Sequence, residues 1–317
     1  MHARRSIGLA FALASAASFG ISGILASSLL DAGWTSGAVT TVRISGGALV
    51  LLGPTLWLLR GRWDAVARSW KEVLVLGVLA IALCQLAFFS AVAYIQPSLA
   101  LLIEFLGPVL LVFATWAVTR RAPAWLTLAG AGVALVGLAL ISGVGGDALH
   151  PIGVLLALGS AIGNAAYWVV ASKPDSELHP IALAGLGMVV GAVVLGAASL
   201  TGLLPFEANA EPVVLAGATV PMWVVVGLVV LVSTAAAYVL GILGGRRLGA
   251  TLASFVGYSE TMFAIVWTAL LLWILPTPPQ LLGAAAIVAG VVLVRLGQNG
   301  RSRAARSPNV VEGVPAP

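Results

Sequence analysis

Charged side chains are scarce in this chain of 317 residues. They make up 9% of the sequence, whereas a soluble globular domain carries about 25%. Hydrophobic residues account for 60% of the positions, and the mean hydropathy is +1.08. A helix that spans a bilayer needs about 20 apolar residues, so ten such helices would use most of the chain. The composition therefore excludes a soluble domain of any size and indicates a protein whose surface faces lipid.

Cysteine and histidine are also rare. The single cysteine, Cys84, excludes an intrachain disulfide and a cysteine-based metal cluster. The three histidines, His2, His150 and His179, fall outside the apolar segments, and no nucleophile–base arrangement is recognisable. We therefore expect no metal, no other cofactor and no enzymatic activity. A membrane-embedded lipid enzyme is the remote alternative from another functional class.

Ten apolar segments of helical length follow one another with short connections, which predicts an all-α membrane protein. The first segment resembles a signal peptide at its start, where Arg4 and Arg5 precede it, but its apolar run is too long for one. We interpret it as the first of ten transmembrane helices. The approximate ranges are 7–30, 37–59, 73–94, 97–118, 123–142, 151–172, 180–200, 222–243, 250–272 and 280–296.

Lysine and arginine are missing from every second connection between these segments. All 16 of them except Arg43 lie before the first segment, or at the end of an even-numbered one or after it. Short cytoplasmic loops retain basic residues and translocated loops do not, so we expect both termini in the cytoplasm of a bacterial-type inner membrane. This orientation accounts for the net charge of +5 without a nucleic-acid partner. The expected partners are the lipid bilayer, a small-molecule substrate and protons.

A weak internal repeat divides the chain into two halves. Gly130 and Gly137 recur as Gly283 and Gly290 at an offset of 153 residues. Five helices in each half are an odd number, so the second half must run upside down relative to the first, as in many transporters. Such a bundle can form a complete pathway, which leaves a monomer and a homodimer open.

The expected organisation follows from this repeat. Residues 1–6 form a cytoplasmic N-terminus, 7–142 the first five-helix repeat and 151–296 the second. Residues 297–317 are polar and contain proline, which predicts a disordered cytoplasmic tail.

Three charged residues fall inside apolar segments, where a charge normally pairs or faces a cavity. Arg43 and Glu104 lie at similar depths below the outer surface, so they form either an ion pair or a substrate-binding pair. Glu260 lies near the middle of the ninth segment, and no basic residue shares its depth. Because desolvation penalises the charged form of a carboxyl, Glu260 is our candidate for proton coupling. The alternative is a protonated core residue held by hydrogen bonds.

Further polar and aromatic residues inside the segments are candidates for the lining of the same cavity, although hydrogen bonds between helices would also explain them. They are Gln85, Asn164, Tyr167, Tyr238, Tyr258 and Trp267.

Several short motifs occur in a fixed order along the chain. They are residues 41–48 (TVRISGGA), 104–108 (EFLGP), 233–238 (STAAAY), 247–249 (RLG) and 259–260 (SE). Together they resemble the drug/metabolite transporter superfamily, EamA branch, and are similar above all to its threonine/homoserine exporter subgroup. The resemblance covers roughly residues 7–296 and implies ten helices in two inverted repeats and export of small metabolites, amino acids in particular.

The chain departs from the pattern of these relatives at two places. They usually have proline after the glutamate of the ninth helix, where this chain has Thr261. They also have a Gly-Glu-Arg-like turn after helices four and nine, where this chain has residues 119–121 (TRR) and 273–275 (WIL). We expect the first change to straighten helix nine and the second to remove a cap.

These observations predict a secondary active transporter that exports small zwitterionic metabolites, amino acids among them, by proton antiport. The carboxylate of an amino acid would bind Arg43, and its ammonium group would bind Glu104 or Glu260. The alternative is a multidrug exporter of hydrophobic cations, in which Glu260 and aromatic neighbours would hold the positive charge.

Overall fold

The computed structural model describes residues 2–143 and 150–304, and all structural statements refer to these residues. Ten helical spans among them are long and apolar enough to cross a membrane, so the predicted number of transmembrane helices is confirmed. The first five spans are α1 (His2–Gly20) with α2 (Ser22–Asp31), α3 (Ser36–Leu58), α5 (Trp70–Leu74) with η1 (Val75–Leu83) and α6 (Cys84–Val92), α7 (Pro97–Glu104) with α8 (Gly107–Thr119), and α9 (Trp125–Ser142).

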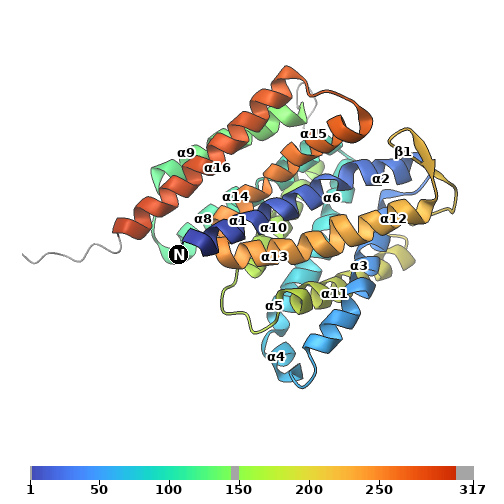
Figure 1. Ribbon diagram of the computed structural model, residues 1–317, viewed down its shortest axis with the longest axis horizontal. Coiled ribbons are helices and arrows are strands. Elements are labelled where there is room, and N and C mark those ends of the chain that lie inside the picture. The colour runs from blue at the N-terminus through green and yellow to red at the C-terminus, as the bar shows by residue number, and fades with distance from the viewer. Residues whose placement is uncertain (1, 144–149, 305–317) are drawn as a thin grey trace, which may run out of the picture.

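The second five spans repeat this arrangement except at their start, where α10 is whole and the first span is interrupted (Figure 1). They are α10 (Pro151–Ala171), α11 (Pro180–Leu200), α12 (Met222–Val230) with η2 (Leu231–Ala236) and α13 (Ala237–Leu248), α14 (Ala250–Gly257) with α15 (Ser259–Leu272), and α16 (Pro278–Ala304). A short helix, α4 (Trp63–Arg68), lies in the connection between the second and third spans.

Interruptions occur at equivalent places in the two halves. The fourth span breaks at Phe105 and Leu106 and the ninth at Tyr258, and Phe105 and Tyr258 are 153 residues apart, which is the offset of the repeated glycines. The π-helical turns η1 and η2 likewise widen the third and eighth spans. The interruption at Tyr258 is present although Thr261 replaces the proline of the relatives, and Tyr258 itself keeps helical backbone angles.

The turns after α8 and α15 are also equivalent. Arg120 and Trp273 both cap their helices with a left-handed backbone, at φ 54° and 57°. This is the conformation that glycine adopts most readily at a helix C-terminus. The resemblance places glycine in these turns, and the chain keeps their geometry with bulkier residues.

Three further differences from the expected organisation concern a hairpin and the two ends of the described chain. A two-stranded antiparallel hairpin, β1 (Val213–Leu215) with β2 (Ala218–Val220), interrupts the otherwise helical fold. Its two-residue turn has positive φ at Ala216 and Gly217, as a tight hairpin requires. The α16 helix continues to Ala304, so residues 297–304 are helical where the sequence predicted a disordered tail; residues 305–317 lie outside the described part. At the other end, α1 begins at His2, within the predicted N-terminal segment.

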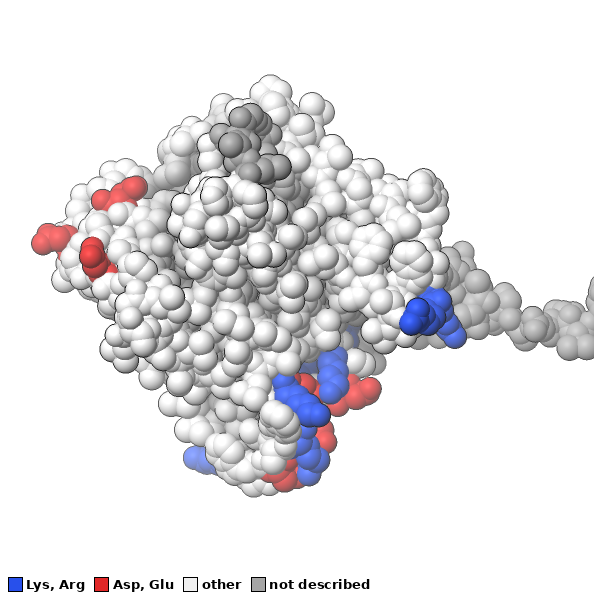
Figure 2. Space-filling view, turned by 180° about the vertical axis from the view of Figure 1, so that it is seen from behind, with Lys and Arg blue, Asp and Glu red and all other residues white. Residues whose placement is uncertain are grey.

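The two ends of the bundle differ in charge. Asp31, Glu207 and Glu211 lie at one end, where the described connections contain no lysine or arginine. The basic residues of the loops gather at the other end, together with a few carboxylates (Figure 2). We call these the acidic end and the basic end.

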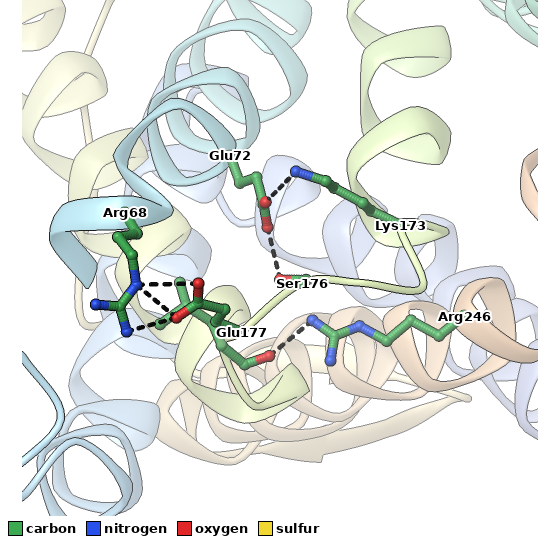
Figure 3. Close-up of polar contacts among 7 residues, drawn as sticks. Arg68, Glu72, Lys173, Ser176, Glu177 and Arg246 are labelled. Carbon is green, nitrogen blue, oxygen red and sulfur yellow. Dashed lines mark hydrogen bonds and ion pairs between the residues drawn. The ribbon is translucent and has the colours of Figure 1, made fainter. Parts of the chain in front are cut away.

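Hydrogen bonds and ion pairs tie the two halves together at the basic end (Figure 3). Arg68, from the first half, contacts Glu177, from the second, at 2.7 Å, and Lys173 contacts Glu72 at 2.6 Å. Arg246 donates a hydrogen bond to the carbonyl of Leu178 at 2.8 Å. We call this network the basic-end tie.

The acidic end carries a corresponding tie without charges. The connection between the first and second spans binds the segment that leads to the hairpin. Trp34 Nε1 donates to the carbonyl of Asn209 at 3.0 Å, and the Thr35 hydroxyl donates to the carbonyl of Pro205 at 2.8 Å. The inverted arrangement thus pairs equivalent connections at both ends but with different chemistry.

Small residues allow the two halves to meet closely at α9 and α16, which run side by side along one edge of the molecule (Figure 1). A Cβ at Gly137 would lie 2.5 Å from the carbonyl oxygen of Gly283, and one at Gly130 would lie 2.6 Å from that of Gly290. The pairing runs in opposite directions along the two helices, so equivalent helices cross as antiparallel partners.

We predict that Gly137→Ala destabilises the protein by about 1–3 kcal/mol, because the added methyl group would force the α9 and α16 backbones apart. The matched control is Gly132→Ala on the same helix, where a Cβ would meet no atom within 4 Å. That variant should be neutral or slightly more stable, since alanine is the better helix former. Thermal unfolding in detergent measures both; equal melting temperatures would contradict the close approach.

The basic-end tie predicts a pH dependence of stability. Hydrogen bonds from the Arg68 guanidinium hold the pKa of Asp64 and Glu177 below their usual range. A carboxyl whose pKa is lower in the folded state stabilises the protein above its unfolded pKa of about 4, and this contribution disappears as the pH falls through the folded pKa. The melting temperature should therefore fall below about pH 5. The decrease in melting temperature with falling pH should be shallower in Glu177→Gln and unchanged in Glu211→Gln. Identical plots of melting temperature against pH for the wild type and both variants would refute the contribution of the basic-end tie.

Candidate functional site

A cavity of about 420 Å³ lies in the middle of the bundle, between the two halves. Spans one to four, six, eight and nine supply its lining, whereas the fifth, seventh and tenth supply none. The three intramembrane charges, Arg43, Glu104 and Glu260, all line it. We call it the central cavity.

The central cavity opens toward the acidic end. Its lining reaches Leu30, next to the last residue of α2, and Ser36, the first residue of α3. Leu30 is 41% exposed, so the mouth of the cavity lies between the ends of these two helices.

Close helix packing closes the floor of the cavity toward the basic end. A Cβ at Gly244 of α13 would lie 2.8 Å from the backbone nitrogen of Ala12 in α1. A Cβ at Gly257 of α14 would lie 2.6 Å from the ring of Trp168 in α10. No room for a side chain remains at these two contacts, which lie on the side of the cavity nearer the basic end.

Arg43 does not form an ion pair with Glu104, which corrects one of the two expectations for these residues. Its Nε donates to the Thr234 hydroxyl at 3.2 Å and its Nη2 to the carbonyl of Ser233 at 3.4 Å, both in the π-helical turn η2. Its Nη1 donates to the Ser22 hydroxyl at 3.4 Å. A π-helical turn displaces backbone carbonyls from their regular positions and is frequent at functional sites, and here it presents acceptors to the guanidinium.

Glu104 is the last residue of α7, and neutral donors hold its carboxylate. Ser160 of α10 donates to Oε2 at 2.8 Å, and the Cys84 thiol, at the end of η1, lies 3.8 Å from Oε1. The charges of Glu104 and Arg43 still interact across the cavity. Both charged groups are therefore oriented by neutral partners and are not neutralised by each other.

Glu260 lies in the first turn of α15, because the ninth span breaks at Tyr258. Its carboxylate makes no hydrogen bond or ion pair with any residue in the described part of the chain, and it faces the central cavity. It interacts through space with Glu104 and Arg43. The expectation that Glu260 stands apart from basic residues was therefore wrong, since Arg43 shares its cavity.

Four of the six predicted lining residues contribute to the central cavity: Gln85, Asn164, Tyr167 and Tyr238. The Oδ1 of Asn164 and the hydroxyl of Tyr167 are buried without a hydrogen-bond partner. Such groups are rare in folded proteins.

The other two predicted lining residues, Tyr258 and Trp267, do not line the cavity. Tyr258 is fully buried and donates its hydroxyl hydrogen to the carbonyl of Phe105 at 2.6 Å. Trp267 donates from Nε1 to the carbonyl of Ala17 at 2.9 Å. Both serve helix–helix contacts, because a polar group inside the bundle needs a partner wherever it lies.

The sequence did not single out several residues of the site. Ser160 and Cys84 hold Glu104, but isolated small polar residues in apolar helices carry no signal of their own. Aromatic side chains also line the cavity, and nothing in the sequence distinguishes them from those that face lipid. They are Phe19, Phe88, Phe89, Phe105 and Trp168.

We predict that Tyr258→Phe lowers the free energy of unfolding by about 1–3 kcal/mol, because it leaves the carbonyl of Phe105 buried without a donor. The matched control is Tyr94→Phe, at a position that is 47% exposed, which should change the melting temperature little. A wild-type melting temperature for Tyr258→Phe would show that the link between the two helix breaks adds no stability.

Known proteins resemble this chain over nearly its whole length. The sequence pattern of the EamA-like transporter family matches residues 6–143 and again residues 151–296. An uncharacterized inner membrane transporter of Salmonella typhimurium, YicL, is 24% identical over 311 residues, which cover 94% of this chain and 98% of that protein. The two family matches bear out two repeats of five spans each, the second inverted.

The fold has a counterpart among solved structures. One, described only as "Crystal structure of protein", superposes with a TM-score of 0.75 at 18% sequence identity. The match covers 95% of this chain and 99% of that one. At this identity the likeness establishes the shared fold.

Proposed function

Because the chain belongs to the EamA-like transporter family and is thus a multi-pass membrane transporter, we propose that it exports small zwitterionic metabolites, amino acids above all, in exchange for protons. We place it nearest to the threonine/homoserine exporter subgroup, on the motifs that contain Arg43 and Glu104. The observation that carries the proposal is the convergence of Arg43, Glu104 and Glu260 on one cavity without an ion pair among them.

The arrangement of the charges suits a zwitterion. Arg43 provides a cation for a carboxylate. Glu104 provides an anion for an ammonium group. The volume of about 420 Å³ lies in the range of pockets for small molecules.

Proton exchange fits the surroundings of Glu260. Its carboxylate has no hydrogen-bond partner in the described chain, so a proton or an ammonium group would be its first close partner. If a proton and the ammonium group of the substrate compete for the carboxylates of the cavity, proton binding favours substrate release, and substrate binding favours proton release. Antiport then follows from differential binding without covalent chemistry.

The orientation is part of the proposal. We place the basic end in the cytoplasm, because lysine and arginine are retained in cytoplasmic loops. The central cavity then opens to the outside and its floor faces the cytoplasm. An exporter in this state has released its substrate and is open to protons from the outer side.

The aromatic lining favours one alternative. Five aromatic rings besides the tyrosines surround a cavity that contains two carboxylates and one guanidinium, and aromatic faces attract organic cations. A multidrug exporter of hydrophobic cations would use these rings and Glu260. Arg43 separates the two functions, because a cation gains nothing from a guanidinium.

We predict that amino acids added to proteoliposomes with an internal pH dye drive proton flux, and that Glu260→Gln abolishes it. The amide cannot load or release a proton, although it fills the same space. The control is Glu207→Gln at the acidic end, which should retain the flux of the wild type. Normal pH-dependent flux in folded Glu260→Gln would refute the assignment of proton coupling to this residue.

We predict that Arg43→Gln abolishes the response to amino acids, since the substrate carboxylate loses its cation. A lipophilic cation tested on the same vesicles distinguishes the alternatives. If the wild type responds to the cation alone, and Arg43→Gln retains or increases that response, the multidrug alternative replaces the amino-acid proposal.

A further inference from the structure

A second cavity of about 550 Å³ lies beside the first at the acidic end. Its walls are α2, α15 and the hairpin of β1 and β2, and we call it the α2–α15 cleft. Gly20, Gly23 and Ala264 line both this cleft and the central cavity. These three residues therefore form the boundary between the two spaces, next to Glu260.

One stripe of α15 runs through both spaces. Glu260, Ala264, Thr268 and Leu272 follow one another at intervals of four residues, which places them on one face of the helix. Glu260 and Ala264 line the central cavity, whereas Ala264, Thr268 and Leu272 line the cleft. The face that holds the carboxylate of Glu260 thus continues along the cleft to the end of the helix.

The α2 helix separates the two openings. Ala26 and Leu30 face the central cavity and its mouth, whereas Ser27 and Asp31 face the cleft. Below them, a Cβ at Gly20 would lie 2.8 Å from the carbonyl of Glu260, so α1 touches α15 directly. The helix is interrupted at Ile21, and beyond the interruption a Cβ at Gly23 would meet nothing within 4 Å. The departure of α2 from α15 at this point opens the cleft.

A few polar groups lie in the otherwise apolar lining of the cleft. Asp31 lies at its rim and forms no ion pair with any residue in the described part of the chain. The hydroxyl of Ser27 lines it further, whereas those of Ser28 and Thr268 donate to carbonyls of their own helices. Polar groups of this kind are the partners that water molecules need in a space of this size.

From this arrangement we propose that the α2–α15 cleft is a water-filled route by which protons reach Glu260, separate from the mouth through which substrate leaves. A hydronium ion in the cleft gives its proton to the Glu260 carboxylate, which leaves a water molecule and a neutral carboxylic acid. Asp31 at the rim attracts the cation. The proposal rests on the proposed role of Glu260 in proton coupling.

Other charged and titratable groups meet Glu260 from the central cavity and not from the cleft. They are Arg43, Glu104, Tyr167 and Tyr238. On the cleft side, Asp31 is the one titratable residue among the lining residues. A substrate bound to Arg43 and Glu104 would therefore leave the approach through the cleft free.

The test is the reactivity of a thiol at the junction of the two spaces. Ala264→Cys in a Cys84→Ser background places one cysteine there, and a permanently charged methanethiosulfonate reagent reports its access to water. The protein is held in lipid nanodiscs, so that both ends are open to the reagent. Ser27→Phe then fills the cleft, and Ala26→Phe, one residue away on the same helix, fills the mouth. Thr268→Phe fills the cleft from its other wall if Ser27→Phe does not fold.

We expect the charged reagent to modify Ala264→Cys, and we expect the cleft-filling change to reduce the rate to background. The mouth-filling change should leave most of the rate. The proposal is overturned if Ala26→Phe alone removes the reaction, or if the rate falls only when both openings are filled. Reaction with an apolar reagent but not with the charged one would show that the cleft contains lipid, and it would also overturn the proposal.

Transport separates this proposal from the proposed function. In proteoliposomes, Ser27→Phe should slow substrate-driven proton flux while substrate affinity measured by calorimetry stays at the wild-type value. If the wild type shows no such flux, the proposed function fails, but the thiol reactivity still decides whether water reaches Ala264 through the cleft. If flux is present and Ser27→Phe leaves it unchanged, the proton route fails while the proposed function stands.

Discussion

A charged group cannot remain in the hydrocarbon core of a membrane without partners or water, and this constraint accounts for much of the bundle's centre. Arg43, Glu104 and Glu260 bring three charges to that depth, and the cavity between the repeats is the space in which all of them are accommodated. The π-helical turns η1 and η2 lie beside two of the charges and help to place the neutral partners Cys84, Ser233 and Thr234. The irregular backbone lies in spans that supply lining residues to this cavity.

The two halves of the inverted repeat are alike in backbone structure but differ in their functional side chains. The fourth and ninth spans break at equivalent residues, and the hydroxyl of Tyr258 satisfies the carbonyl of Phe105, its counterpart in the other half. The two carboxylates, however, occupy opposite sides of these breaks: Glu104 ends α7, and Glu260 begins α15. Glu104 accepts a hydrogen bond from Ser160, whereas the Glu260 carboxylate has no hydrogen bond in the described chain. Two carboxylates at similar depth can therefore perform different tasks.

Much of the fold could be predicted from the sequence because a bilayer imposes simple rules on composition and length. The ten spans, their grouping in two halves and the depth of Arg43, Glu104 and Glu260 follow from apolar runs and the placement of charges. The roles of Tyr258 and Trp267 could not be predicted, because the sequence does not tell which face of a helix meets a cavity and which meets another helix. The absence of an ion pair between Arg43 and Glu104 also required the structure, since equal depth says nothing of separation across the bundle.

The two ties between the repeats indicate which helices can move. Both the ionic basic-end tie and the uncharged tie at the acidic end are formed in this state. The lining of the cavity reaches the acidic end with both ties in place, so access there does not require breaking either of them. The floor of the cavity is made of another kind of contact, in which Gly244 and Gly257 lie against Ala12 and Trp168 without a charged group. Such contacts depend on packing alone, whereas the ion pairs of the basic-end tie are largely exposed and each contributes little. If access alternates, α1 and α14 can part from α13 and α10 at the floor, while Arg246 keeps α13 bound to the connection between the sixth and seventh spans.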